Sequence, residues 1–169
     1  MNSRNLINAL AAMLGTNARG ANRKNFPLVE EKDHPTDITF SLARTEVDVS
    51  DYDGGRMSFS LRAIELSNDT VVPTKEKAMQ KVSESDPHFQ QFFEDESNST
   101  RLDIPRALDH AGMSGNYFRI LRDIVTVIDG YALKSRGPTL LGASNQFGNE
   151  CIAFFVQLEN SAVIIQIRD

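Results

Sequence analysis

The sequence contains no tryptophan and a single cysteine, Cys151, among its 169 residues. One cysteine forms no internal disulfide, and such usage is typical of a reducing compartment, so we expect a cytoplasmic protein. The three histidines, His34, His88 and His110, have no zinc-ligand spacing with this cysteine. Cys151 opens an apolar run, where a buried, inert thiol is the usual state. We therefore predict no metal, no cofactor and no catalytic residue.

Long apolar runs are also missing. No stretch approaches the roughly 20 apolar residues that a membrane helix needs, so we predict no membrane partner. The net charge of −5 argues against non-specific nucleic-acid binding, although its distribution is uneven. Residues 1–28 contain four basic side chains and no acidic one, whereas residues 29–100 are strongly acidic. The length fits a single domain over residues 1–169 with a substantial core.

The N-terminal residues predict a helix followed by a basic segment. Residues 3–14 have a helical apolar stripe and are interpreted as an amphipathic helix rather than a cleaved signal, with Gly15 as its end. The next stretch is polar, basic and rich in glycine and asparagine, which predicts a loop and a mobile segment at 15–36. It is either a solvated linker or a contact for an anionic partner through Arg19, Arg23 and Lys24.

Alternating apolar residues predict two hairpins. Residues 37–49 and 56–66 alternate on either side of an Asp-Gly-Gly turn, which indicates antiparallel strands with one buried face. Residues 151–158 and 162–167 form a second pair, apolar on both faces and therefore central in the sheet. A short strand is expected at 139–141. The glycine-rich stretch 137–148 around it matches neither a P-loop nor a dinucleotide fingerprint.

The longest helical pattern covers residues 114–133. Its apolar residues recur at steps of three and four, Ser114 suits the N-cap, and Gly130 marks an end or a bend. Shorter helices are expected at 74–82, 86–93 and 104–110. These elements predict an α+β fold: an antiparallel sheet of four to five strands is covered on one face by helices, and the helix at about 114–133 is central.

The pair of helices at 104–121 resembles a bacterial helix-turn-helix. The residues that carry the resemblance are Leu108, Ala111, Gly112, Met113, Ser114, Phe118 and Leu121. The resemblance implies a DNA-binding regulator in which a second set of residues points toward the major groove: Ser114, Gly115, Asn116, Arg119 and Arg122. The alternative is an ordinary pair of packed helices that contributes to the core.

Three phenylalanines lie on the short helix at 86–93, where they either pack in the core or form a docking patch: Phe89, Phe92 and Phe93. Because no catalytic pattern is present, the first hypothesis is a non-catalytic protein–protein interaction protein. Such a protein is an adaptor, an inhibitor, a chaperone or a subunit of a larger assembly, bound to another chain or to itself. The alternatives are the DNA-binding regulator and a small enzyme with a pocket near residues 137–148.

Overall fold

The described helices and most of the described strands lie where the sequence predicts them. The computed structural model describes residues 2–26, 29–33, 38–54, 57–67, 74, 116–131, 138–144, 151–159 and 161–168. The elements in these ranges are α1 (Asn2–Asn17), β1 (Ala18–Asn25), β2 (Val29–Asp33), β3 (Ile38–Tyr52), β4 (Phe59–Ser67), α5 (Asn116–Asp129), β5 (Thr139–Ser144), β6 (Cys151–Gln157) and β7 (Ser161–Arg168).

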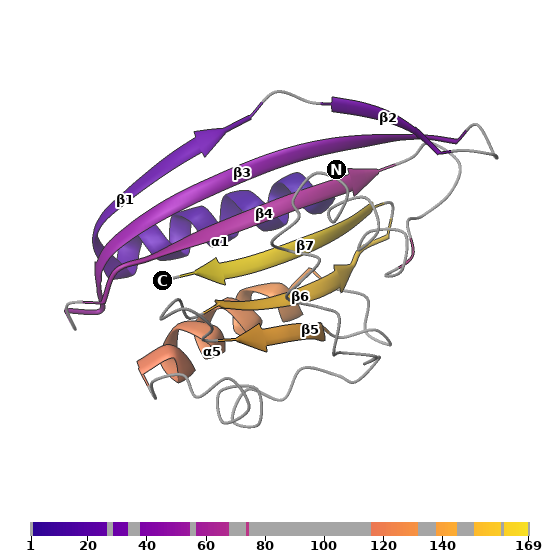
Figure 1. The fold of residues 1–169 in the computed structure, drawn as a ribbon. Helices are drawn as coiled ribbons and strands as arrows, with labels where there is room; N and C mark the ends of the chain where they lie inside the picture. The colour runs from indigo at the N-terminus through magenta and orange to yellow at the C-terminus, as the bar shows by residue number, and fades with distance from the viewer. Residues whose placement is uncertain are drawn as a thin grey trace.

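All of these strands belong to one antiparallel sheet (Figure 1). Its order is β1-β3-β4-β7-β6-β5, and β2 pairs with β3 on the same edge as β1. The hairpin β3–β4 and the hairpin β6–β7 join through β4 and β7, so the two halves of the chain share one sheet. The predicted α+β class is confirmed, and its five expected strands correspond to β3, β4, β5, β6 and β7.

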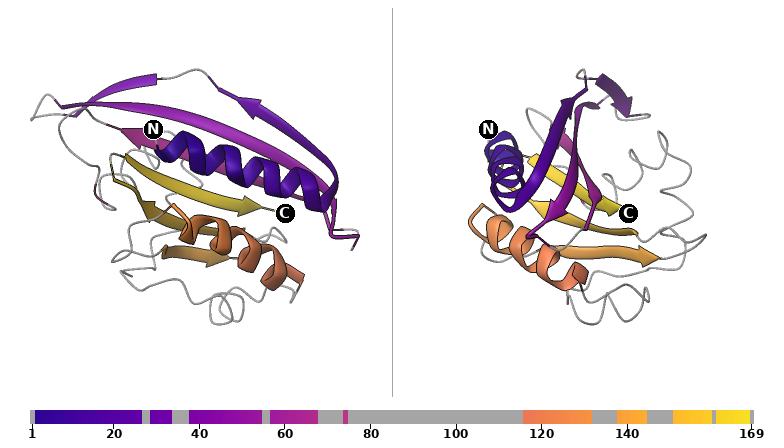
Figure 2. Two further views of the ribbon diagram at one scale, coloured as in Figure 1. Left: turned by 180° about the vertical axis from the view of Figure 1, so that it is seen from behind. Right: turned by 90° about the vertical axis from the view of Figure 1, so that its left-hand side faces the viewer.

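Both helices cover the same face of the sheet, as the edge-on view in Figure 2 shows. α1 lies against β1, β3 and β7 and beside α5. Each helix turns one apolar stripe inward, because residues three and four apart share a helix face. The fully buried residues of these stripes are Leu6, Ile7, Leu10 and Leu14 in α1 and Tyr117, Ile120, Leu121, Ile124 and Ile128 in α5. They form one core cluster with alternate residues of the strands.

The first helix is longer than expected, since it passes Gly15 and ends at Asn17. Thr16 Oγ1 donates a hydrogen bond to the carbonyl oxygen of Ala12 (2.9 Å), and the Asp53 N–H donates to the carbonyl oxygen of Asn17 (2.6 Å). A bond from the β3–β4 turn thus satisfies a carbonyl at the helix C-terminus that has no partner inside the helix. Tertiary contact here outweighs the low helix propensity of glycine.

The central helix is confirmed over residues 116–129. α5 extends from Asn116 to Asp129 and ends before the predicted limit of 133, so Gly130 marks its end rather than a bend. The Gly130 N–H donates to the carbonyl oxygen of Val127 (3.1 Å) and the Tyr131 N–H to that of Ile128 (2.9 Å). These bonds to the third preceding residue tighten the final turn and satisfy orphan carbonyl groups.

The turn between β3 and β4 lies where the Asp-Gly-Gly sequence predicts it. Asp51, Asp53 and Gly54 have φ values of 50°, 53° and 71°, which aspartate tolerates and glycine adopts freely. The Tyr52 N–H closes the turn by donating to the carbonyl oxygen of Met57 (3.0 Å). The turn therefore fixes the register of the two longest neighbouring strands.

β6 and β7 are buried on both faces, which confirms their predicted central position. Phe154 and Ile165 are paired on the face covered by the helices, and Phe155 and Ile164 are paired on the opposite face. Their exposed fractions are 0–6%. Ile64 of β4 pairs with Ile164, so this apolar row on the opposite face continues across three strands.

The prediction of a loop after α1 was wrong over residues 18–25, because these residues form the strand β1. β1 pairs with β3 from Ala18 opposite Tyr52 to Asn25 opposite Thr45. β2 then pairs with the other half of β3, from Val29 to Asp33. Because β4 occupies only one edge of β3, the backbone groups of the other edge need partners, and this need outweighs the poor strand propensity of the segment.

Candidate functional site

The candidate site for a partner is the outer edge of β1. β3 binds one side of β1, and no strand in the described part of the chain pairs with its other side. The Phe26 N–H donates to the carbonyl oxygen of Arg44 (2.9 Å), which fixes the hydrogen-bonding phase of this ladder. Since residues of an antiparallel ladder alternate, Gly20, Asn22 and Lys24 bond to β3.

The residues between them present their backbone groups to the outside. By the same alternation, the N–H and C=O groups of Ala21, Arg23 and Asn25 point away from β3, along the free edge. The register of β1 against β3 continues without a bulge from Gly20 to Asn25. An extended segment of another chain would therefore find a regular set of donors and acceptors.

The three basic residues that the sequence singled out, Arg19, Arg23 and Lys24, all lie on this strand. The side chain of Arg19 is 84% exposed and pairs with Asp51 at 3.6 Å. Arg23 is half-buried and Lys24 is exposed. β1 contains no acidic residue, so its free edge is positively charged.

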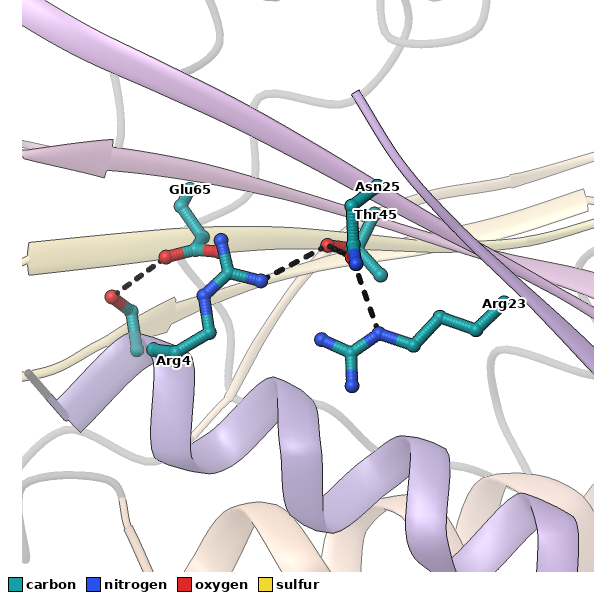
Figure 3. Close-up of polar contacts among 6 residues, drawn as sticks. Arg4, Arg23, Asn25, Thr45 and Glu65 are labelled. Carbon is teal, nitrogen blue, oxygen red and sulfur yellow. Dashed lines mark hydrogen bonds and ion pairs between the residues drawn. The ribbon is translucent and has the colours of Figure 1, made fainter. Parts of the chain in front are cut away.

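Arg23 is held by a network of polar side chains between α1 and the sheet (Figure 3). Its Nε donates to Asn25 Oδ1 (3.2 Å), which also accepts a hydrogen bond from Thr45 Oγ1 (3.2 Å). Thr45 is fully buried and in turn accepts a hydrogen bond from Arg4 Nη1 (3.4 Å). The network thus links the first turn of α1 to the exposed strand.

The network ends at a buried carboxylate, Glu65, on β4. Arg4 Nη2 lies 2.7 Å from Glu65 Oε1, and Ser3 Oγ donates to Glu65 Oε2 (3.0 Å). The Glu65 side chain is 9% exposed, and the Arg4 side chain is 39% exposed. A carboxylate at this depth is stable only with such donors, so the pair fixes the start of α1 against the sheet.

The opposite face of the same strands carries a second charged group. Arg62 Nε lies 3.1 Å from Glu46 Oε1, and Arg44 Nε lies 3.5 Å from the same oxygen. The Arg44 guanidinium also stacks over the Phe26 ring, 3.8 Å from its centroid. Lys24 is opposite Glu46 in the register and therefore lies on the same face as Arg44 and Arg62.

At the other end of α1, Tyr52 joins the β3–β4 turn to α5. Its hydroxyl donates to Asp123 Oδ2 (2.7 Å), and its ring packs edge-on against Phe59. Burial, together with this bond to a carboxylate, raises the pKa of the Tyr52 phenol well above its ordinary range. Arg119 forms an ion pair with Asp53 of the turn.

Replacing Tyr52 with phenylalanine is expected to lower the free energy of unfolding by about 1–2 kcal/mol near neutral pH, because the bond to Asp123 is lost. The raised pKa means that this contribution is present below the unfolded pKa of about 10 and declines as the pH rises further. Urea unfolding of both proteins on either side of that pH measures the difference. A difference that stays constant above it would contradict the assignment.

The exposed side of α5 contains the residues predicted for DNA contact. Arg119 and Arg122 have side chains that are 62% and 58% exposed, and Phe118 is 39% exposed. Asn116 is the first residue of the helix. Ser114, Gly115 and the preceding helix at 104–110 lie outside the described residues. Carboxylates of Asp53 and Asp123 lie beside the two arginines, which weakens the attraction of this surface for phosphate.

Several predicted features lie outside the described residues, namely Phe89, Phe92 and Phe93, the three histidines, and positions 137 and 145–148 of the glycine-rich stretch at 137–148. Among the residues that the structure describes, no cluster of histidine, cysteine and acidic side chains suits a metal ion. Neither α1 nor α5 is long and apolar enough to cross a membrane. Sequence reasoning missed the Arg4–Glu65 pair, because the two residues are 61 positions apart in the sequence and no local pattern connects them.

Comparison of the chain with models of protein families, with curated proteins and with solved structures finds no match in any of the three.

Proposed function

We propose that this chain is a non-catalytic interaction protein that binds an extended segment of another protein along the free edge of β1. Such a protein acts as an adaptor, an inhibitor, a chaperone or a subunit of a larger assembly. The observation that carries the proposal is the regular row of outward N–H and C=O groups at Ala21, Arg23 and Asn25. Addition of a strand to such an edge is a common way of recognising peptides.

The two edges of the sheet differ in a way that favours β1. At the opposite edge, the register of β5 shifts between Leu140 and Gly142, which interrupts its hydrogen-bonding pattern. A bulge of this kind is a common protection of an edge against pairing. β1 has no such interruption, so its edge accepts a continuous strand.

The charges of β1 select among the chains that could pair with it. Arginine and lysine on an edge strand oppose pairing with a second copy of the same edge, because like charges would lie side by side. The same charges favour an acidic segment. Protection against self-pairing is therefore a role that Arg19, Arg23 and Lys24 share. Binding of an acidic partner falls mainly to Arg23 and Lys24, because Arg19 already pairs with Asp51.

Amide hydrogen exchange tests the proposal at single residues. In the free protein, we expect slow exchange at Gly20, Asn22 and Lys24 and fast exchange at Ala21, Arg23 and Asn25. A short peptide of valine and threonine at millimolar concentration should slow exchange only at Ala21, Arg23 and Asn25.

Duplex DNA, added in place of the peptide, tests the alternative function, which is DNA binding. If DNA alone shifts amide signals, and these lie on α5, the proposal is wrong.

A pair of proline variants supplies the matched control. Ala21→Pro removes an outward N–H, so it should abolish peptide binding while lowering stability by less than about 1 kcal/mol. Asn22→Pro removes an N–H that bonds to β3 and should lower stability by about 1–3 kcal/mol. Chemical denaturation and peptide titration of both variants measure the two effects. Equal effects of the two variants would mean that the edge is not free.

A further inference from the structure

The side chains of β1 also indicate the sequence that its edge selects. We infer that the bound segment has two adjacent acidic residues, one opposite Arg23 and the next opposite Lys24. This inference rests on the proposed function, because it assumes that a strand pairs with this edge. It adds a register and a chemical class of partner, namely an acidic peptide segment.

Arg23 and Lys24 lie on different faces of the sheet. Arg23 is opposite Val47, which belongs to the core cluster beneath the helices, so Arg23 lies on the helix-covered face. Lys24 is opposite Glu46 on the other face. Residues directly opposite each other in an antiparallel pair share a face, so a strand added to β1 must have acidic residues at adjacent positions to meet both.

On the helix-covered face, the uncompensated positive charge at the edge of the sheet comes from Arg23. The charge of Arg4 is compensated by Glu65 at 2.7 Å, whereas no carboxylate of the described residues forms an ion pair with Arg23. The Arg23 Nε is bound to Asn25 Oδ1, and its terminal nitrogen atoms remain as donors. A guanidinium that is already held in place loses less conformational freedom when it binds a carboxylate.

Arg4 acts on this site only through other residues. It donates to Thr45, Thr45 donates to Asn25, and Asn25 holds Arg23. Arg4, Thr45 and Asn25 are thus positioning residues, and Arg23 is the residue that meets the anion. The opposite face is also positive around Lys24, because Glu46 already has Arg62 and Arg44 as partners.

The test compares peptides that differ only at the two central residues of a valine and threonine strand. We expect the peptide with two adjacent glutamates to bind the full chain about tenfold more tightly than the peptide with two glutamines. Raising the salt concentration should reduce this ratio, since the contacts are exposed to solvent. Two glutamates separated by one residue should recover only part of the gain, because both then lie on one face.

Two charge-removing variants of the same strand provide the decisive comparison. Arg23→Gln should remove about half of the preference for glutamate on a logarithmic scale, whereas Arg19→Gln should leave most of it, because Arg19 already pairs with Asp51. Asn25→Ala keeps every charge of β1 and should still weaken the glutamate preference. Equal binding of the glutamate and glutamine peptides, or equal effects of the two arginine variants, would overturn the inference while strand addition itself stands. If no peptide slows exchange at Ala21, Arg23 and Asn25, the proposed function fails and the inference fails with it.

Discussion

Replacing Ile124 with alanine is expected to lower the free energy of unfolding by about 2–5 kcal/mol, a large share of the stability of a domain of this size. Ile124 lies at the middle of α5 with an exposed fraction of 0%. It belongs to the cluster that joins α5 to α1 and to the helix-covered face of the sheet. Removing three of its carbon atoms leaves a cavity that packed neighbours on several elements fill only in part.

The control for this variant lies on the same helix. Thr126 is exposed, and its hydroxyl donates to the carbonyl oxygen of Arg122 (2.8 Å), four residues earlier. Thr126→Ala removes a side chain without creating a cavity and raises helix propensity, so stability should change by less than about 0.5 kcal/mol. Urea denaturation followed by circular dichroism measures both variants. Similar changes in the two would show that α5 contributes little to the core.

The position of Ile124 illustrates which parts of the fold the sequence determines locally. In α5, apolar residues recur at steps of three and four, and only a helix places residues with this spacing together on one buried face. In β3 and β4, alternation together with an Asp-Gly-Gly turn leaves little choice but a hairpin. These signals lie within single segments, and for this reason the helices and the five main strands were predictable.

Local sequence patterns do not predict β1. The segment from Ala18 to Asn25 has only two apolar residues, both alanines, and it contains no alternation that would predict a strand. It becomes a strand because β3 offers it an unpaired edge, and the residues of the segment itself do not indicate this partner. β3 extends only three residues beyond each end of the part that β4 pairs, which gives no local indication of a further strand.

The charged residues of the candidate site were partly predictable for the same reason. Arg19, Arg23 and Lys24 are close in sequence, so their shared position required no knowledge of the fold. The network behind Arg23 joins α1, β1, β3 and β4, and pairs such as Ser3 with Glu65 depend on how these elements pack. The sequence indicates basic residues that could meet an anion. The fold shows that Arg19 pairs with Asp51, whereas no carboxylate among the described residues pairs with Arg23.

The second large effect is expected from Arg4→Ala, which should lower the free energy of unfolding by about 2–3 kcal/mol. The variant leaves the Glu65 carboxylate, whose side chain is 9% exposed, without the Arg4 cation and, among the described side chains, with Ser3 as its remaining donor. The expected loss is below that of a fully buried pair because the Arg4 side chain is 39% exposed. Adding Glu65→Gln to Arg4→Ala should restore part of the lost stability, because a neutral amide is less costly to bury than an unpaired charge.

Arg19→Ala is the matched control, since it removes the same type of side chain from a pair that faces solvent. The Arg19 side chain is 84% exposed and lies 3.6 Å from Asp51, so stability should change by less than about 1 kcal/mol. Urea denaturation of Arg4→Ala, Glu65→Gln, their double variant and Arg19→Ala gives the coupling free energy of the buried pair. If Arg4→Ala and Arg19→Ala have the same small effect, the Arg4–Glu65 pair does not hold α1 to the sheet. If only Arg4→Ala is destabilising, the buried pair with Glu65 holds the start of α1 to the sheet.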